Sequence, residues 1–418
     1  MRLNHHPHRD HLRGRGYFNR LGPGLITGAA DDDPSGIGTY AQVGASTGYG
    51  LLWTAPLLLP FAIVVQEACA RLALANRAGL ARIIKRNFPK PIVVLAVLLV
   101  VVANTVNIAA DLASMGAALQ LILPMPQLVG VVLFTSAIAV SEIMVPYHRY
   151  ARVLRWLCLS LLAYVAVLLT IHVDWADVLH HAVWPHVEWD RASFAACIAL
   201  AGTTISPYLF VWQAAEEVEE MQQGVADISP VHLRAMRIDV AAGMLSGVVI
   251  MFSIMVTTGT ELHNAGILDV MSAEDAAAAL RPLAGPAAGL LFALGILGLG
   301  LLAVPVLAGA SAYAVAELMD WPESLERRPS RAKAFYGVIV LSMVVAFALN
   351  LLKVNPMHAL FIAALTNGLA APILLLLIGI LVSRRSVMGD LRSGPWGRGL
   401  LFASVALMTL PPVLWIIQ

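Results

Sequence analysis

Long apolar segments, separated by short polar connections, follow one another through the chain after about its twentieth residue. A bilayer core about 30 Å thick is crossed by roughly 20 helical residues, because each residue adds about 1.5 Å along the helix axis. On this measure the pattern predicts eleven membrane-spanning helices. Their expected limits are 21–47, 50–74, 91–122, 127–146, 153–172, 192–220, 237–259, 286–317, 334–352, 358–382 and 398–417.

The positions of Lys and Arg provide a test of this assignment, because short cytoplasmic loops of membrane proteins are enriched in basic residues. With the N-terminus in the cytoplasm, all but three of the 27 basic residues fall on the cytoplasmic side; the exceptions are Arg191, Arg281 and Lys353. An extra or missing span would scramble this segregation. We therefore expect a multi-pass protein of a bacterial-type inner membrane, with the N-terminus inside and the C-terminus outside.

Composition agrees with this class and excludes others. Hydrophobic residues make up 59% of the chain and charged residues only 13%, which is far from the balance of a soluble domain. The net charge of +1 gives no basic field for nucleic acid. Cys69, Cys158 and Cys197 form no C-x-x-C pair, so neither a disulfide framework nor a thiolate metal site is expected.

The first apolar segment contains a sequence that does not suit a membrane helix. Residues 28–40 read GAADDDPSGIGTY, with Asp31, Asp32 and Asp33 followed directly by Pro34. Each ionised carboxylate near the bilayer centre costs about 2.5 to 3.5 kcal/mol on the insertion scale. The three must therefore face water, a cation or one another, and the proline and glycines predict that the helix is interrupted here.

A second segment has the same features. Residues 201–220 read AGTTISPYLFVWQAAEEVEE, with Pro207 inside an otherwise apolar span. The proline frees carbonyls of the preceding turn, which are tolerated at membrane depth only where they line a cavity or meet a ligand. Interrupted helices at corresponding positions of two halves indicate the central site of a transporter.

Three motifs resemble the NRAMP family of divalent-metal transporters. GPGLITGAADDDPSG, 22–36, is similar to the family's first-helix signature, GTTISPY, 202–208, to its sixth-helix motif, and NIAADLASMGAAL, 107–119, to its third-helix region. The resemblance implies an all-α leucine-transporter fold with two inverted five-helix repeats, broken first and sixth helices, and alternating access. It places a cytoplasmic tail at 1–20, the transport core at 21–382 and an eleventh helix at 398–417.

Carried over residue by residue, the resemblance predicts an altered metal site. The family's aspartate falls on Asp33, its asparagine on Gly36, its coordinating alanine carbonyl on Thr203, its methionine on Ser206 and its histidine on Tyr208. The remaining ligands, Asp33, the Thr203 carbonyl and Ser206, are all oxygens. Oxygen ligands favour hard cations such as Mg²⁺, with Mn²⁺ also accommodated. In lacking the methionine, the chain is similar to a magnesium-carrying branch of the family.

Other residues are assigned to the substrate pathway and to a proton route. The pathway is expected to include Asp32, Gly36, Pro207, Tyr208 and Trp212. Asp111 matches the family's third-helix aspartate, but the glutamate three residues later is Ser114. The resemblance therefore implies weak or altered proton coupling.

Glu216 and Glu217 allow two interpretations. They could replace the missing members of a proton relay if the helix continues inward, or they could form a solvated cytoplasmic end that faces Arg234 and Arg237. The second interpretation is favoured, because charged residues at a span end are usually hydrated.

Several alternatives stay open at this level. A transporter of the same fold for a small organic cation or an amino acid would also satisfy Asp33, because an ammonium group pairs with a carboxylate.

The outer connection 172–190 is interpreted as interfacial anchoring by tryptophans, with a cation-gathering surface as the alternative. The stretch NHHPHRDH, 4–11, is interpreted as a tail rather than a metal site. The chain shows no H-E-x-x-H, G-x-S-x-G or phosphate-binding loop, so no enzyme is expected. No cofactor and no obligate protein partner is predicted beyond the lipid bilayer, the metal ion and possible protons.

Overall fold

Helices form all the regular structure in the described part of this computed structural model, residues 28, 31–144, 162–186, 189–222, 224, 228–325 and 329–418. The longer helices are α2 (Pro34–Thr47), α3 (Thr54–Asn76), α5 (Lys90–Gln120), α6 (Gln127–Met144), α10 (Arg191–Thr204), α11 (Pro207–Gln222), α12 (Pro230–Thr258), α15 (Ala288–Met319), α16 (Lys333–Asn350), α17 (Pro356–Ser383) and α19 (Pro395–Ile417). The shorter elements are α4 (Leu80–Asn87), α8 (Leu162–Val167), α9 (Trp175–Val183), η3 (Gly259–His263), α13 (Ala273–Ala278), α14 (Arg281–Ala284), η4 (Gly285–Ala287), η5 (Pro329–Arg331), α18 (Arg385–Met388) and η6 (Gly389–Leu391). The expected all-α class is confirmed.

Nine helical segments of the described residues are long and apolar enough to cross a membrane. They coincide with nine of the eleven predicted spans, and the sixth span is the pair α10 and α11. The other two predicted spans, 21–47 and 153–172, lie partly outside the described residues. Cys158 and the tail 1–20 lie entirely outside them. The total of eleven spans stays a prediction.

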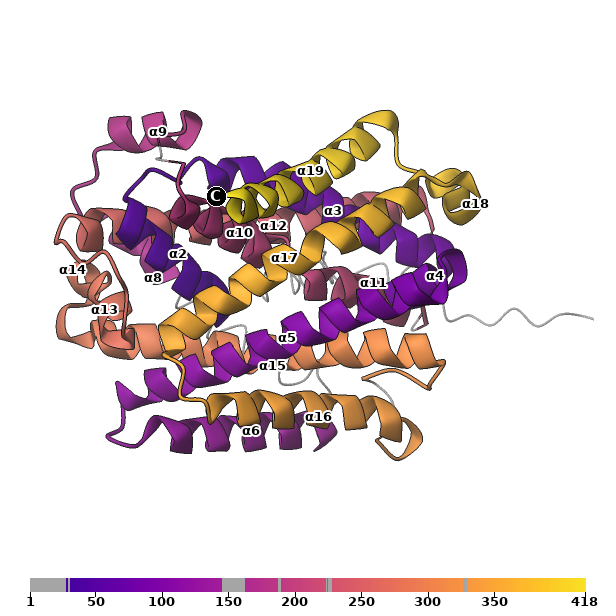
Figure 1. Ribbon diagram of the computed structural model, residues 1–418, viewed down its shortest axis with the longest axis horizontal. Helices are drawn as coiled ribbons and strands as arrows, with labels where there is room; N and C mark the ends of the chain where they lie inside the picture. The colour runs from indigo at the N-terminus through magenta and orange to yellow at the C-terminus, as the bar shows by residue number, and fades with distance from the viewer. Residues whose placement is uncertain are drawn as a thin grey trace, which may run out of the picture.

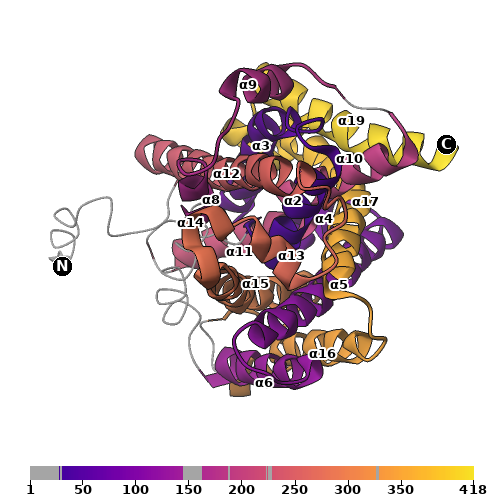
Figure 2. The same cartoon turned by 90° about the vertical axis from the view of Figure 1, so that its left-hand side faces the viewer.

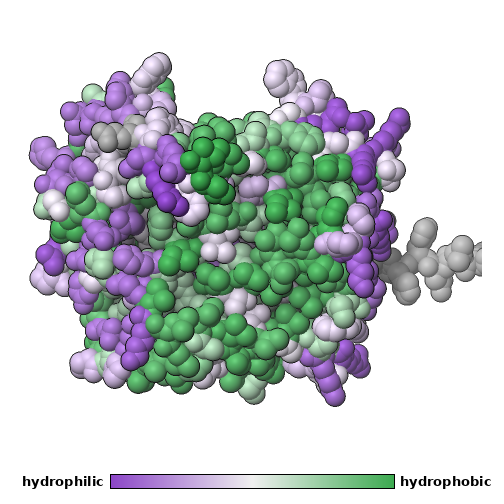
Figure 3. Space-filling view, viewed as in Figure 1, coloured by the Kyte–Doolittle hydropathy of each residue, from purple (hydrophilic) through white to green (hydrophobic). Residues whose placement is uncertain are grey.

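A broad apolar band covers the middle of the face shown in Figure 3, and hydrophilic residues gather at its left and right ends. Large apolar side chains such as Leu98 of α5, Leu133 of α6 and Leu341 of α16 are exposed. An exposed apolar surface of this extent is stable when lipid covers it. The membrane normal therefore runs from left to right in this view.

The two interrupted helices lie at the centre of the bundle. Helix α2 packs against α10, α12 and α17, and α11 packs against α3 and α15. Figures 1 and 2 show α5, α15 and α17 around these helices, with α6 and α16 forming an outer layer on one side. The core elements thus surround the breaks and hold them away from lipid.

Ion pairs join elements at the end of the molecule that carries α4 and α18 (Figure 1). Glu67 of α3 pairs with Arg237 of α12 at 2.6 Å, and Lys85 of α4 pairs with Asp320, just after α15, at 2.5 Å. Exposed ion pairs each contribute little stability. Their positions nevertheless show that the basic connections fold back onto the helix ends.

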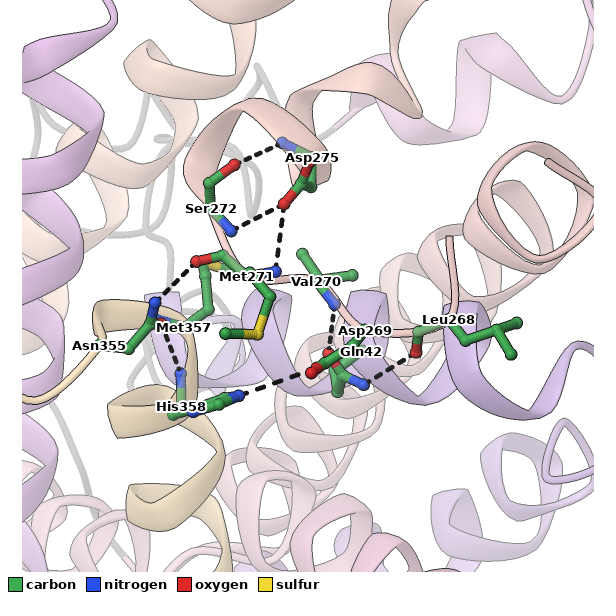
Figure 4. Close-up of polar contacts among 10 residues, drawn as sticks. All are labelled: Gln42, Leu268, Asp269, Val270, Met271, Ser272, Asp275, Asn355, Met357 and His358. Atoms are coloured by element: carbon green, nitrogen blue, oxygen red, sulfur yellow. Dashed lines mark hydrogen bonds and ion pairs between the residues drawn. The ribbon is translucent and has the colours of Figure 1, made fainter. Parts of the chain in front are cut away.

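The opposite end is closed by hydrogen bonds from the connection between η3 and α13 (Figure 4). Gln42 of α2 donates to the Leu268 carbonyl at 3.2 Å and accepts from the Val270 backbone N–H at 2.8 Å. Asn355, which caps α17, donates to the Met271 carbonyl at 2.8 Å. This connection therefore links α2 directly to the N-terminal end of α17.

Candidate functional site

The first break lies between Asp31 and Pro34. Asp33 has an extended backbone, with φ −66° and ψ 169°, and its Oδ1 accepts hydrogen bonds from the Gly36 backbone N–H at 2.8 Å and the Ser35 hydroxyl at 2.6 Å. Aspartate before the helix and proline at its first position are both favoured, since the carboxylate satisfies a free N–H and proline has none. The predicted interruption of the first helix is confirmed.

The second break separates α10 from α11. Ile205 has φ −122° and ψ 65°, outside helical geometry, and Pro207 begins α11. The Ser206 hydroxyl donates to the carbonyls of Gly202 at 2.7 Å and Thr203 at 2.9 Å. The interruption expected here is also confirmed. Ser206 uses its proton within the last turn of α10, and its oxygen lone pairs stay available to another partner.

The two breaks lie against each other. A methyl group built on Gly36 would lie 3.1 Å from Thr203 Oγ1. That hydroxyl oxygen is buried and has no hydrogen-bond partner among the described residues. The sequence predicted the Thr203 carbonyl as a ligand, and the structure adds the Thr203 side chain as a second oxygen beside α2.

A third helix contributes a residue that the sequence reasoning did not single out. Asn107 of α5 donates from Nδ2 to Asp33 Oδ2 at 2.6 Å, so both oxygens of Asp33 are held. Asn107 is completely buried. Asn104, Asn107 and Asp111 are spaced by three and four residues within an apolar segment, and this spacing places them on one face of a helix. That polar stripe is the signal from which Asn107 could have been found.

Asp31 and Asp32 face a different helix. Both are buried, and a methyl group on Gly247 of α12 would lie 3.2 Å from Asp31 Oδ2 and 3.6 Å from Asp32 Oδ1. Asp33 is instead held by α5 through Asn107. The three consecutive carboxylates therefore point toward two sides of the bundle, and Asp32 lies beside α12 rather than on Asp33's side.

Asp111 is the fourth carboxylate in this region. It is fully buried, the Ser35 backbone N–H is the donor that faces it, no described side chain donates to its oxygens, and Asp33 is its principal charged neighbour. Within the described residues, no lysine or arginine neutralises any of the four carboxylates. A buried carboxylate without a counter-ion must bind a proton or a cation.

Tyr208 and Trp212 lie one turn apart on α11, and both are completely buried. Tyr208 is within electrostatic range of Asp33 and Asp111. Trp212 packs on α15, where its ring lies 6.5 Å from the ring of Tyr313. Of the predicted pathway residues, Tyr208 therefore borders the acidic cluster, whereas Trp212 belongs to the packing between α11 and α15.

The interpretation of Glu216 and Glu217 as a solvated end is wrong. Their exposed fractions are only 3% and 1%. Glu217 accepts a hydrogen bond from Gln213 at 3.2 Å and lies 3.8 Å from His232 Nε2. The reason is that α11 continues between α3 and α15 instead of emerging into water.

The family is decided by a comparison with family models, in which the model described as "Natural resistance-associated macrophage protein-like" matches residues 24–418. The chain belongs to the NRAMP family. NRAMP proteins are membrane transporters of divalent metals and not enzymes, so the expectation that the chain is no enzyme holds.

Curated relatives within the NRAMP family match most of the chain. The divalent metal cation transporter MntH of Aeromonas hydrophila is 28% identical over 385 residues, covering 90% of this chain and 89% of the relative. The MntH protein of Yersinia pestis is 30% identical over 289 residues, covering 67% of this chain and 68% of the relative.

Solved structures show the same fold at low identity. The manganese transporter of Eremococcus coleocola gives a TM-score of 0.73 at 16% identity, covering 95% of this chain and 87% of that one. MhsT, solved in complex with L-phenylalanine, gives a TM-score of 0.62 at 17% identity, covering 95% and 97%. The predicted leucine-transporter fold is confirmed.

Proposed function

We propose that this NRAMP protein carries divalent metal cations across the membrane by alternating access, and that hard ions, Mg²⁺ and Mn²⁺, are its preferred cargo. The observation that carries this proposal is the buried cluster of Asp31, Asp32, Asp33 and Asp111, which no described lysine or arginine neutralises. A divalent cation held at Asp33 supplies part of the missing positive charge. The two facing breaks support alternating access, because such discontinuous helices form the central site in transporters of this architecture.

The ligand atoms proposed for the ion are oxygens from both breaks. Asp33 supplies the charge, and Thr203 and Ser206 supply neutral oxygens. Gly36 brings no ligand, but Thr203 Oγ1 lies against it without another partner. An oxygen on α10 thus takes the place of a side-chain oxygen on α2. Carboxylate, hydroxyl and carbonyl oxygens, completed by water, suit Mg²⁺ and Mn²⁺.

Sulfur coordination is not supported by the residues around the break. Met251 of α12 is a thioether beside it, and its sulfur lies 3.7 Å from the hydroxyl oxygen of Thr204, which donates its proton to the Leu200 carbonyl at 2.9 Å. This contact belongs to the packing between α10 and α12, and none of the three proposed ligands, Asp33, Thr203 and Ser206, carries sulfur. The proposed preference for hard ions follows from this set of oxygen ligands without sulfur.

Proton coupling is proposed to be weak or altered. Asp111 lies close enough to Asp33 for the two carboxylates to act on each other electrostatically. Ser114, in contrast, donates its hydroxyl to the Asp111 carbonyl at 2.8 Å and carries no ionisable group. Glu216 lies one turn after Trp212 on α11 and is farther along this helix from the second break than Tyr208.

The rival substrate, an organic cation or an amino acid, needs a larger space than a metal ion. The ring of Tyr208 is fully buried beside the acidic cluster, and the ring of Trp212 is fully buried against α15. Cavities of about 400 and 490 Å³ occur elsewhere, one lined by α13 to α15 and the other by α6 and α16. Neither supports an organic substrate between the breaks.

Calorimetry on the purified full-length protein tests the proposal. Wild type and Asp33→Ala are titrated with Mg²⁺, Mn²⁺ and Ca²⁺, and Asp390→Ala is the matched control, because Asp390 is an exposed carboxylate outside the site. We expect Mg²⁺ and Mn²⁺ to bind wild type and the control, and binding to fall at least about tenfold in Asp33→Ala. The proposal fails if none of the ions binds, or if Asp33→Ala binds them as wild type does.

A further inference from the structure

Three histidines form a cluster at the end of the molecule that carries α9. His180 and His181 lie in the last turn of α9, and His186 lies in the connection that follows. One ring nitrogen of each lies within 4.8 Å of the other two. The ring centroids are 5.0 to 5.5 Å apart. Three imidazoles at these distances can bind a single ion after small rotations of two exposed side chains and one half-buried side chain.

Neighbouring groups already orient two of the rings. His181 Nδ1 lies 3.1 Å from Asp177 Oδ1 and 3.0 Å from the Asp177 carbonyl. His186 Nδ1 faces the Trp184 carbonyl at 3.4 Å. An N–H on Nδ1 leaves Nε2 unprotonated and free to bind a metal. A carboxylate behind a ligating histidine is the usual arrangement in metal sites, because it fixes the tautomer and raises the basicity of the ligand.

We propose that His180, His181 and His186 form a binding site for a transition-metal ion of the zinc class, separate from the site between the breaks. Neutral imidazoles bind Zn²⁺, Ni²⁺, Co²⁺ and Cu²⁺ and bind Mg²⁺ poorly. Three histidines and a water complete the tetrahedron that Zn²⁺ prefers. The protein then has two metal sites with opposite ion preferences. Oxygen ligands between the breaks favour hard ions, and nitrogen ligands of the histidines favour ions of the zinc class.

The position of the histidine cluster gives the bound ion a regulatory role. The His181 ring lies 6.1 Å from the ring of Tyr49, in the turn between α2 and α3. Tyr49 in turn shares a hydrogen bond of 2.6 Å with Thr260 of η3. The backbone of His186 also packs on this turn, since a methyl group on Gly50 would lie 2.8 Å from the His186 carbonyl.

An ion on the three histidines stiffens α9 against this turn, which leads directly into the broken helix α2. This regulatory role rests on the proposed function, because it assumes that α2 moves during transport. Zinc bound at the histidine cluster is then expected to slow transport of Mg²⁺ without entering the site between the breaks.

The binding experiment uses the full chain with His5, His6, His8 and His11 replaced by Gln, so that the histidine-rich stretch near the N-terminus does not bind the probe. Co²⁺ is the probe, because tetrahedral nitrogen coordination gives it strong visible absorption, and Zn²⁺ is titrated against it. We expect one tetrahedral Co²⁺ that Zn²⁺ displaces. The combined variant H180A/H181A/H186A is expected to lose this signal.

Two further variants make the result specific. His172→Ala, an exposed histidine on the same connection, and Asp33→Ala are both expected to keep the Co²⁺ spectrum. The proposal is overturned if the background protein gives no tetrahedral spectrum, if the combined variant keeps it, or if Asp33→Ala removes it. The spectrum requires no transport, so it tests the histidine cluster even where the proposed function fails.

The regulatory role is measured as Mg²⁺ uptake into proteoliposomes with Zn²⁺ added on the α9 side. We expect Zn²⁺ to slow uptake several-fold in the background protein and in His172→Ala, and to have little effect on the combined variant. Equal inhibition of all three proteins overturns the regulatory role. If none of the proteins takes up Mg²⁺ even when Zn²⁺ is left out, the proposed function is overturned instead.

Discussion

In the proposed site, a hydroxyl oxygen on one helix lies where the neighbouring helix has a glycine and therefore no side-chain oxygen. Gly36 leaves a space on α2, and the hydroxyl of Thr203 on α10 lies against that space. The hydroxyl is buried with no partner among the described residues, and a buried polar atom of this kind costs about 1 to 3 kcal/mol when it is unsatisfied. Binding a cation would recover that energy.

Replacing Thr203 with Ala is therefore expected to weaken Mg²⁺ binding by about tenfold, which corresponds to about 1.4 kcal/mol. Thr204→Ala is the matched control, because the Thr204 hydroxyl already donates to the Leu200 carbonyl at 2.9 Å. Gly36→Asn in the Thr203→Ala background is expected to restore part of the affinity, since the asparagine fills the space that the hydroxyl leaves. Calorimetry measures all four proteins. Unchanged affinity in Thr203→Ala would show that its hydroxyl is no ligand.

Asn107 is expected to position Asp33 for the ion. Asn107→Ala removes the hydrogen bond to Asp33 Oδ2 and should lower Mg²⁺ affinity by about tenfold, because the carboxylate is then free to rotate. Asn104→Ala is the comparison, because Asn104 bonds to α15 at the Leu307 carbonyl and Ser311 instead. It should lower the melting temperature without changing the affinity. Equal effects of both variants on affinity would contradict a positioning role for Asn107.

At this scale the sequence was informative where neighbours in the chain decide the structure. Asp33 and Pro34 form a helix start by local rules, so the position of the break followed from the motif itself. Asn107 contacts Asp33 across 74 residues. Such a contact depends on how α2 and α5 pack, and only the polar stripe on 91–122 hinted at it.

Among the elements, the close approach of α10 to α17 holds the second break in place. A methyl group on Gly202 would lie 2.3 Å from the Ala364 carbonyl, and one on Gly368 would lie 2.3 Å from the Ile198 carbonyl. Both obstacles are backbone atoms, which cannot move aside as a flexible side chain does. Small residues allow membrane helices to pack this closely.

Gly368→Ala is accordingly expected to destabilise the protein by about 1 to 3 kcal/mol, the usual penalty for overpacking. Gly337→Ala on α16 is the opposite case, because a methyl group there meets nothing within 4 Å. It should stabilise the helix by about 0.5 to 1 kcal/mol. Thermal unfolding in detergent compares the two. If both variants melt at the same temperature, close packing of α10 and α17 is not limiting.

The elements also show where sequence patterns fail. The acidic run on α11 was read as a solvated end, although Glu216 and Glu217 are buried. Charge in a sequence indicates exposure only where the helix leaves the bundle. Whether it does so depends on α3 and α15, which the local pattern does not describe.

At the scale of the whole molecule, the face in Figure 3 shows polar residues at two opposite ends with an apolar band between them. One end has the ion pairs of α4, and the other has the connection that joins α2 to α17. Span limits could be predicted from hydropathy alone, because lipid selects long apolar segments. How those spans pack around the two breaks could be seen only in the three-dimensional structure.

The predicted sidedness is tested by labelling single cysteines in a protein whose Cys69, Cys158 and Cys197 are replaced by Ser. Glu274→Cys on α13 and Arg385→Cys on α18 occupy exposed positions at opposite ends. With the N-terminus inside, an impermeant maleimide added to intact cells should label Glu274→Cys, and Arg385→Cys only after the membrane is opened. The reverse pattern would show that the orientation derived from the basic residues is wrong.

The central claim is that Asp33 anchors a site that carries hard divalent ions. Its most direct test is Mg²⁺ uptake into proteoliposomes that contain wild type, Asp33→Asn or no protein. Asparagine keeps the shape of Asp33, removes its charge and replaces one of its two accepting oxygens by an NH₂ donor, which would face the donors Asn107 or Gly36. We predict rapid Mg²⁺ uptake by wild type, competition by Mn²⁺, and a fall of about tenfold or more in Asp33→Asn toward the rate of empty vesicles. Uptake by Asp33→Asn at the wild-type rate, or no uptake of either ion by wild type, would contradict this account.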